Sequence, residues 1–391
     1  MDIHRTMKYL KYYISTLTLI VAIYVCALGT HFPTAFFIGF SIFIILGDIL
    51  VAQDDQELQY RHAFFLNLPI YINLPLLLVF LLTVVYMLGE KPFNIFSNFF
   101  LVNFRLDLAY ARESISTMDS IFLVALSGLF IGIMGTVPGH ELVHRKKDKF
   151  DMFMGNWLLA MSWDCAFAVE HVYGHHKNVG LTRDPATAKR GQNIYAFILR
   201  AIAKEQKDAW SIELDQSKRR GLSIISLKNK MIVGYLRSLT ITLFSLYIGG
   251  TSGMLIFLAC AFIAKSLLEV INFTEHYGLV RVSGEVVCPR HSWNSNSIMS
   301  SIYLYNVTRH SSHHEKASLK YWELKVYNNA PMMPQGYLSM LYLALFVPYY
   351  FHKMMAKKLI DWDNNYATKE ERRLSKEQNK SSGVSILMSK V

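Results

Sequence analysis

The chain alternates long apolar runs with shorter polar stretches, and several runs approach the roughly 20 residues that a membrane-spanning helix needs. Six such runs can be drawn along the sequence, at residues 12–30, 33–52, 63–88, 119–139, 232–250 and 252–272. Such long apolar runs suit a bilayer better than the core of a soluble domain. The pattern therefore predicts an all-α membrane protein with about six transmembrane helices.

Positive charge is distributed unevenly between these runs. Lys and Arg collect at the N-terminus, in residues 177–230 and after residue 352. Because the cytoplasmic side of a membrane protein carries the excess of Lys and Arg, all three regions are predicted to be cytosolic. The net charge of +11 is then assigned to contact with anionic lipid headgroups rather than with nucleic acid.

These features divide the chain into five predicted parts. With a cytosolic start and six spans, the chain between the fourth and fifth spans and the chain after the sixth lie in the cytosol, where they would form a histidine-rich helical domain. The parts are residues 1–139 with four spans and an interfacial segment, 140–230 with two histidine motifs and a basic helical region, 231–275 with the last two spans, 276–362 with further histidine motifs and an apolar helix, and 363–391 as a flexible tail.

Nine of the fourteen histidines fall into four tight groups. The groups are HELVH at 140–144, HVYGHH at 171–176, EHYG at 275–278 and HSSHH at 310–314. Spacings of three or four residues place side chains on one face of a helix, so each group can present imidazoles to one centre. Neutral imidazole is a good ligand for first-row metals. The four groups together predict a metal site at the cytosolic edge of the membrane.

The identity of the metal has two interpretations. The HELVH sequence alone is also the zinc metalloprotease pattern, with Glu141 as general base. A zinc protease needs one further protein ligand, whereas seven more clustered histidines are present here. Two irons can use that many ligands and can deliver electrons to O2, which zinc cannot. A di-iron oxygenase is favoured, with a zinc protease and a metal transporter as alternatives.

The motifs resemble those of the membrane-bound alkane 1-monooxygenases, within the wider group that includes xylene monooxygenase and membrane fatty-acid desaturases. The resemblance extends over about residues 115–362. It is carried by HELVHRK, EHVYGHHKNVGLTRDPATAKRG, NFTEHYGLVR, PRHSWNSNS and RHSSHH, in the order and spacing of that family. The Glu-His-Tyr-Gly motif is typical of the hydroxylase branch. Hydroxylation is therefore favoured, and a fatty-acid or lipid desaturase with the same di-iron site is the alternative.

The resemblance implies a centre of two Fe ions with O2 as co-substrate. It implies nine iron ligands: His140, His144, His171, His175, His176, His276, His310, His313 and His314. It also implies carboxylates that orient the imidazoles by accepting their free N–H groups. These are Glu141, Glu170, Asp184 and Glu275. No catalytic side chain is expected beyond the metal ligands.

Three positions depart from the family's usual residues. Ser312 stands in the last histidine group where Asp is usual, and Ser297 stands where His usually follows Trp-Asn-Ser-Asn. Arg183 replaces an acidic residue beside the retained Asp184. All nine ligand positions remain filled. The departures therefore bear on the surroundings of the ligands, and with them on the substrate.

Electrons must come from another protein, because the four cysteines form no C-x-x-C pair that could hold a rubredoxin-type iron. The resemblance implies rubredoxin and an NAD(P)H-dependent reductase as partners, with membrane lipids and an alkane or alkyl-chain substrate. It implies oxidation of the terminal carbon of that substrate. The predicted location is a bacterial inner membrane, with the active site on the cytosolic side.

Overall fold

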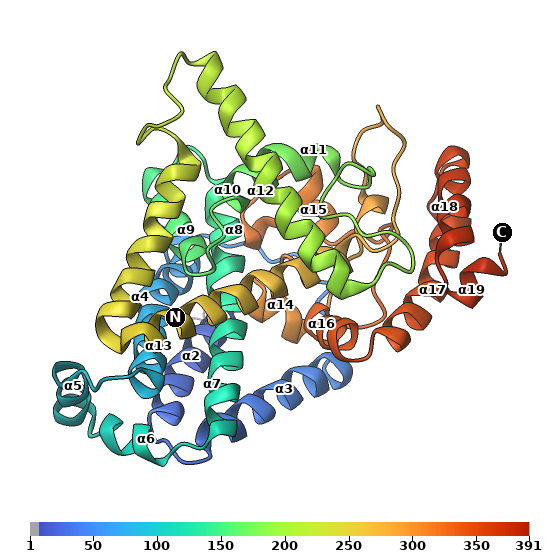
Figure 1. Ribbon diagram of the computed structural model, residues 1–391. Helices are drawn as coiled ribbons and strands as arrows, with labels where there is room; N and C mark the ends of the chain where they lie inside the picture. Colours follow the sequence, from blue (N-terminus) through green and yellow to red (C-terminus); the bar gives the residue numbers. More distant parts are fainter. Residues whose placement is uncertain (1–7, 391) are drawn as a thin grey trace. The chain divides into compact units, whose positions relative to one another are not determined.

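The computed structural model describes residues 8–390, and this part of the chain is helical (Figure 1). Within it no β-strand is present, and the only β-type pairs are two isolated bridges. The chain divides into two compact units. Unit 1 comprises the chain up to Phe43, Tyr60–Cys165 and Ile232–Lys265, and unit 2 comprises Ile44–Gln59, Ala166–Met231 and the chain from Ser266. The prediction of an all-α protein is confirmed.

Unit 1 consists of apolar helices joined by short connections. Its helices are α2 (Tyr13–Cys26), α4 (Ala63–Leu88), α5 (Asn94–Phe104), α6 (Leu108–Ser114), α7 (Thr117–Phe130), the π-helix η1 (Ile131–Thr136), α8 (Val137–His144) and α9 (Lys149–Ala160). Most of α3 (Phe32–Leu50) and of α13 (Lys230–Glu275) also belongs to it. The interfacial segment was predicted at residues 89–118, and this range contains α5 and α6.

Four helical segments are long and apolar enough to cross a membrane. They are α3, α4, the continuous segment Thr117–His144, and α13. The first predicted span is shorter than expected, because α2 has 14 residues. The last two predicted spans are the two arms of α13, which bends at Gly250, where φ is 68°. Figure 1 shows the arms running in different directions. The structure thus has four candidate spans among residues 8–390, where the sequence pattern predicted six.

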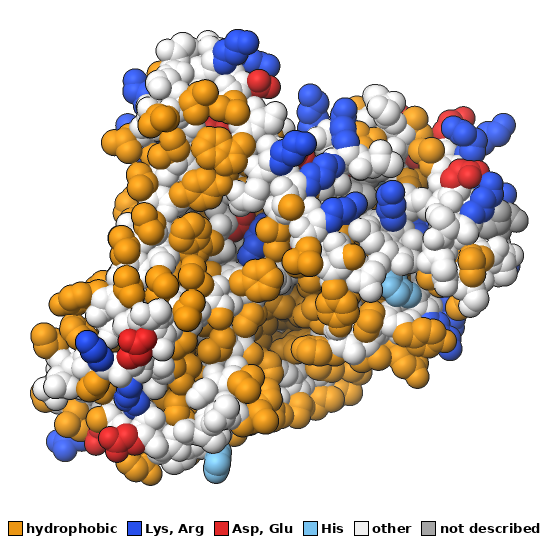
Figure 2. All heavy atoms as spheres, in the orientation of Figure 1, with side chains coloured by type: hydrophobic (Ala, Val, Ile, Leu, Met, Phe, Trp, Pro, Cys, Tyr) orange, Lys and Arg blue, Asp and Glu red, His pale blue; other side chains and the backbone are white. Residues whose placement is uncertain are grey.

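The outer surface of these helices is suited to lipid. On the first arm of α13 a row of large apolar side chains is exposed, comprising Leu236, Leu239, Leu243, Phe244 and Tyr247. Figure 2 shows hydrophobic side chains gathered over this helix on the face that it draws. Exposed apolar area of this extent is unfavourable in water and favourable in a bilayer. The chain is an integral membrane protein.

Unit 2 consists of shorter helices and long connections. Its helices are α10 (Phe167–Glu170), the π-helix η2 (His171–His175), α11 (His176–Asn178), α12 (Ile194–Arg219), the 3₁₀-helix η3 (Pro289–His291), α14 (Ile298–Tyr303), α15 (His310–Glu315), the 3₁₀-helix η4 (Tyr321–Glu323), α16 (Tyr337–Phe346), α17 (Pro348–Asn365), α18 (Lys369–Ser381) and α19 (Ser385–Met388).

The C-terminal segment, predicted to be a flexible tail, forms α18 and α19. Thr368 begins α18 as a helix cap, with its side chain accepting the backbone N–H of Glu371 in a reciprocal capping box. The buried face of α18 is polar and consists of Glu371, Ser375 and Asn379. A segment with so few apolar residues is predicted to be disordered, because it has little apolar surface to bury. Here the buried groups form hydrogen bonds instead.

The docking of this segment depends on Gly191, whose φ is 73°. A Cβ added there would overlap the backbone carbonyl of Ser382. At Gly383, φ is 67° and an added Cβ would meet no atom within 4 Å. We expect Gly383→Ala to cost only backbone strain of about 1–2 kcal/mol, whereas Gly191→Ala should cost more and release α18 and α19.

Thermal unfolding in detergent and limited proteolysis of the C-terminus would measure the difference between these two variants. If Gly191→Ala and Gly383→Ala lose the same stability, and α18 is equally resistant to protease in the two variants, the close contact at Gly191 does not hold the C-terminal segment.

Candidate metal centre

The first two predicted ligands lie one turn apart on α8 in unit 1. The Nε2 atoms of His140 and His144 are 3.1 Å apart. Arg145 ends this helix and its Nη2 donates to Glu141 Oε1 at 2.7 Å, while its Nη1 lies 3.2 Å from Asp151 Oδ2 on α9. These ion pairs fix the end of α8 that carries the two histidines.

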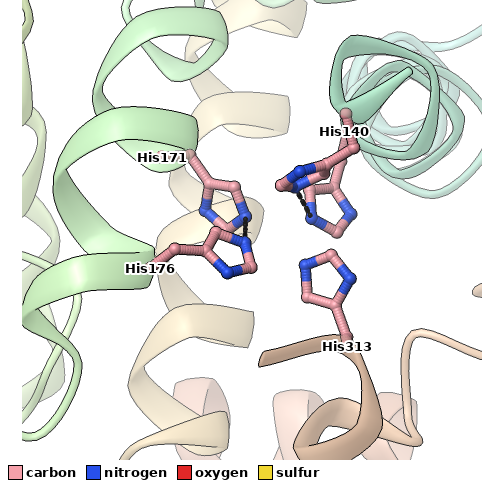
Figure 3. Close-up of side chains that lie close together, drawn as sticks. His140, His171, His176 and His313 are labelled. Carbon is pink, nitrogen blue, oxygen red and sulfur yellow. Dashed lines mark hydrogen bonds between the residues drawn. The ribbon is translucent and has the colours of Figure 1, made fainter. Parts of the chain in front are cut away.

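Three further histidines lie together in unit 2. His171 and His176 are five residues apart, and their Nε2 atoms are 3.1 Å apart. The π-helix η2 makes this possible, because its hydrogen bonds connect residues five apart. The ring of His313 lies 4.7 Å from that of His176 between centroids. Figure 3 shows His313 pointing toward this pair.

A second group of four histidines lies wholly within unit 2. His175, His276, His310 and His314 are buried, and one ring nitrogen of each lies within 4.8 Å of the others. The Nε2 atom of His310 is 3.1 Å from that of His276 and 3.0 Å from that of His314. Adjacent histidines thus join different groups: His175 and His314 belong to this one, whereas His176 and His313 belong to the other. Successive side chains on a helix point about 100° apart, so they cannot face one centre.

The Nδ1 atoms of the second group mostly face hydrogen-bond acceptors. Nδ1 of His175 lies 3.0 Å from Asp184, Nδ1 of His276 lies 3.2 Å from the carbonyl of His291, and Nδ1 of His310 lies 3.3 Å from that of Val307. An N–H is required at each of these positions, which leaves the lone pair on Nε2.

A metal ion would provide the facing Nε2 atoms with a partner for their lone pairs. If each Nε2 carries a lone pair, the pairs at 3.0 and 3.1 Å repel one another unless a cation lies between them. Within residues 8–390, Nε2 of His175 also has no hydrogen-bond partner. Buried ring nitrogens without partners are costly. The donor set of the second group therefore fits a resident metal ion.

The protonation of the imidazoles supports this interpretation. Burial, followed by the charge of neighbouring imidazoles, lowers the pKa of His276 to about 3 and the pKa values of His313 and His314 well below their usual range. Burial also lowers the pKa of His175, but Asp184, Glu170 and Glu269 together raise that pKa overall. A carboxylate on the far nitrogen makes an imidazole a stronger ligand.

The predicted carboxylates occupy different positions. Asp184 contacts Nδ1 of His175 and accepts a hydrogen bond from the Thr187 hydroxyl. Glu275 lies 3.2 Å from Nε2 of His310 through one oxygen, and its other oxygen has no hydrogen-bond partner in the described chain. Glu170 is buried and its charge raises the pKa of His175. Glu141 accepts from Arg145, as described above.

A buried carboxylate that the sequence did not assign to the site lies in unit 2. Asp48 accepts hydrogen bonds from the hydroxyl groups of Ser297 at 2.5 Å, Ser300 at 2.8 Å and Ser339 at 2.8 Å. It therefore connects the starts of α14 and α16. In the sequence, Asp48 is noticeable as a carboxylate within an apolar run. The sequence does not reveal which residues it contacts.

The contact between Asp184 and His175 can be tested by substitution. We expect Asp184→Asn to lower metal affinity by about 10–100-fold, because such partners orient the ligand and raise its basicity. Metal retained after dialysis against a graded chelator would measure this. Asp215→Asn, at an exposed position on α12, is the matched control. Equal retention by the two variants would contradict the assigned role of Asp184.

The chain is similar to known membrane enzymes. The family model named Fatty acid desaturase matches residues 120–344, a range that contains all nine clustered histidines. The chain is 38% identical over 226 residues to alkane 1-monooxygenase 1 of Pseudomonas aeruginosa, covering 56% of this chain and 59% of that protein. It is 38% identical over 245 residues to alkane 1-monooxygenase 2 of Alcanivorax borkumensis, covering 61% and 64%.

A longer alignment joins the chain to the hydroxylase component of the xylene/toluene monooxygenase of Pseudomonas putida. The two are 31% identical over 338 residues, covering 86% of this chain and 85% of that protein. The chain thus spans less than two thirds of the alkane 1-monooxygenases named above but most of this second kind of relative.

Proposed function

Because the chain belongs to the fatty acid desaturase family, we propose that it is a membrane non-haem di-iron monooxygenase that uses O2 to hydroxylate the terminal carbon of an alkane or alkyl-chain substrate. The observation that carries the proposal is the second histidine group, in which buried Nε2 atoms face one another at 3.0 and 3.1 Å. The names of the relatives support the reaction type and the terminal position.

The proposed ligands follow from the two histidine groups and from the sequence resemblance. His175, His276, His310 and His314 would hold one iron. His171, His176 and His313 would be ligands of the other, and the resemblance assigns the pair on α8 to the same centre. When bound, iron supplies the changes of oxidation state by which O2 is reduced and a C–H bond is oxidised.

The side chains of the protein have supporting roles in this proposal. Asp184 and the carbonyl groups of His291 and Val307 hold the imidazoles with Nε2 toward the metal. Burial of the second histidine group excludes water, which would otherwise compete for its ligand positions and for reactive oxygen. No side chain acts as a nucleophile. The apolar helices would hold the hydrocarbon chain of the substrate.

The first test measures metal content and product together. We expect the protein purified in detergent to hold about two irons and, with O2, reduced rubredoxin and octane, to form 1-octanol. Metal analysis and gas chromatography would detect both. A single zinc with no iron would contradict the di-iron proposal, and an alkene in place of an alcohol would move the assignment to a desaturase.

We also propose that the centre faces the cytosol of a bacterium, at its inner membrane, and takes electrons from rubredoxin and its NAD(P)H-dependent reductase. The basic loops support the orientation through the positive-inside rule. Figure 2 shows Lys and Arg side chains gathered along α12 and over α18. An acidic electron carrier would be attracted to such a surface.

A basic cavity in unit 2 offers a docking position for this donor. Its volume is about 590 Å³, and the cationic side chains that line it are Arg183, Lys189, Arg200, Arg281 and Arg373. Two carboxylates also line it, but Glu377 accepts from Lys380 at 2.8 Å, so its charge is paired. Arg183 in the cavity wall is adjacent to Asp184, which contacts the predicted ligand His175. An electron donor bound in the cavity would therefore contact a segment that supports a ligand.

Charge reversal in the cavity tests this docking position. We expect Arg183→Glu and Arg373→Glu each to raise the KM for rubredoxin several-fold at low salt, with little change in kcat, because they remove long-range attraction. The effect should shrink at high salt. Lys228→Glu makes the same charge change at an exposed position outside the cavity. If it raises the KM equally, the attraction is general and the cavity is not the docking site.

A further inference from the structure

Glu371, on the first turn of α18, is fully buried and is held by four donors. One oxygen accepts from Nε2 of His291 at 2.7 Å and from Nη2 of Arg290 at 3.1 Å. The other accepts from Nε of Arg290 at 2.9 Å and from the backbone N–H of Thr368 at 2.8 Å. Only the last of these contacts is needed for capping α18. The other three attach the helix to the segment around η3.

His291 connects this carboxylate to the metal centre. It is fully buried, and its Nδ1 accepts the backbone N–H of Cys288 at 2.9 Å, so Nε2 carries the proton that it donates to Glu371. Both ring nitrogens are therefore occupied, and His291 has none left for a metal. Its carbonyl oxygen faces Nδ1 of His276 at 3.2 Å. Two successive contacts thus lead from Glu371 through His291 to a predicted ligand.

A second contact from the C-terminal helices holds the residues after His276. Arg190 pairs with both oxygens of Asp363 on α17, at 2.6 and 2.7 Å, and donates to Asn379 on α18 at 2.9 Å. Its Nε donates to the carbonyl of Gly278 at 3.0 Å. The backbone just after His276 is therefore attached, through Arg190, to residues of α17 and α18.

We propose that Glu371 is a positioning residue for the metal centre, which acts through His291 to hold the His276 ring with Nε2 toward the other histidines of its group. The inference rests on the proposed function, since it takes His276 to be a metal ligand. Without the carboxylate, the buried Nε2–H of His291 loses its acceptor and the Arg290 guanidinium loses its closer one, since Glu285 lies 3.4 Å from its Nη2. His291 must then reorient, and its carbonyl no longer fixes Nδ1 of His276.

Two variants separate this role from helix capping. Glu371→Gln keeps an acceptor for the capping box, where Gln is also favourable, but it has no negative charge and cannot accept from all four donors. Thr368→Ala removes the capping hydroxyl and leaves the Glu371 carboxylate in place. The readouts are iron retained against a graded chelator, the Mössbauer spectrum of the iron-loaded protein, and proteolysis of α18.

We expect Glu371→Gln to lower iron affinity by about 10-fold, as loss of a ligand's hydrogen-bonded support does, and to change the Mössbauer signal of one of the two irons. Thr368→Ala should leave affinity and spectrum unchanged while α18 becomes more sensitive to protease. A Glu371→Gln protein with the parent's spectrum and affinity would overturn the inference, as would equal spectral changes in both variants. If the parent protein itself holds no iron, the proposed function fails and this inference fails with it.

Discussion

The arrangement of this protein depends on holding buried imidazoles close together against their mutual repulsion. In the second histidine group, Nε2 atoms face one another at 3.0 and 3.1 Å in a site that excludes water. A metal ion can offset that repulsion only if every ring presents a lone pair, and this requires an acceptor at the opposite nitrogen. Asp184 and two backbone carbonyls supply those acceptors for His175, His276 and His310, three of the four rings. The segments that carry them are therefore as important to the site as the histidines.

The backbone of the histidine segments determines how the ligands divide. The sequence correctly predicted that clustered histidines would come together, because their spacings suit one helix face. It could not predict that His175 and His176 join different groups, or that His171 pairs with His176 five residues away. That pairing needs the π-helix η2, in which Gly174 leaves room for the side chain of Glu170. A change of helix type depends on packing and leaves no simple signal in residue spacing.

Hydropathy correctly predicted an all-α membrane protein, but it predicted the ends of several helices less accurately. Apolar runs are a local property, so α3 and α4 follow their predicted ranges closely. The kink in α13 at Gly250 lies where the predicted ranges 232–250 and 252–272 meet, but the ends of the two arms differ from the ends of those ranges. The C-terminal helices were missed for another reason. Their buried residues are polar, and Glu371 finds His291 80 positions away, just as Asp48 finds Ser297 249 positions away. Such pairings are long-range and invisible to a window of residues.

The structure shows what the three residues that depart from the family pattern contact. Ser297 donates to Asp48 and Ser312 accepts the backbone N–H of Lys325, so both hold neighbouring segments together. Arg183 is exposed and lines the basic cavity, although it is adjacent to Asp184. An acidic residue at this position would place a negative charge in the cavity wall where Arg183 places a positive one. Replacement by Arg therefore changes the surface offered to a charged partner while the His175–Asp184 contact is kept. Under the proposed function, this departure would bear on the docking of the electron donor rather than on the substrate.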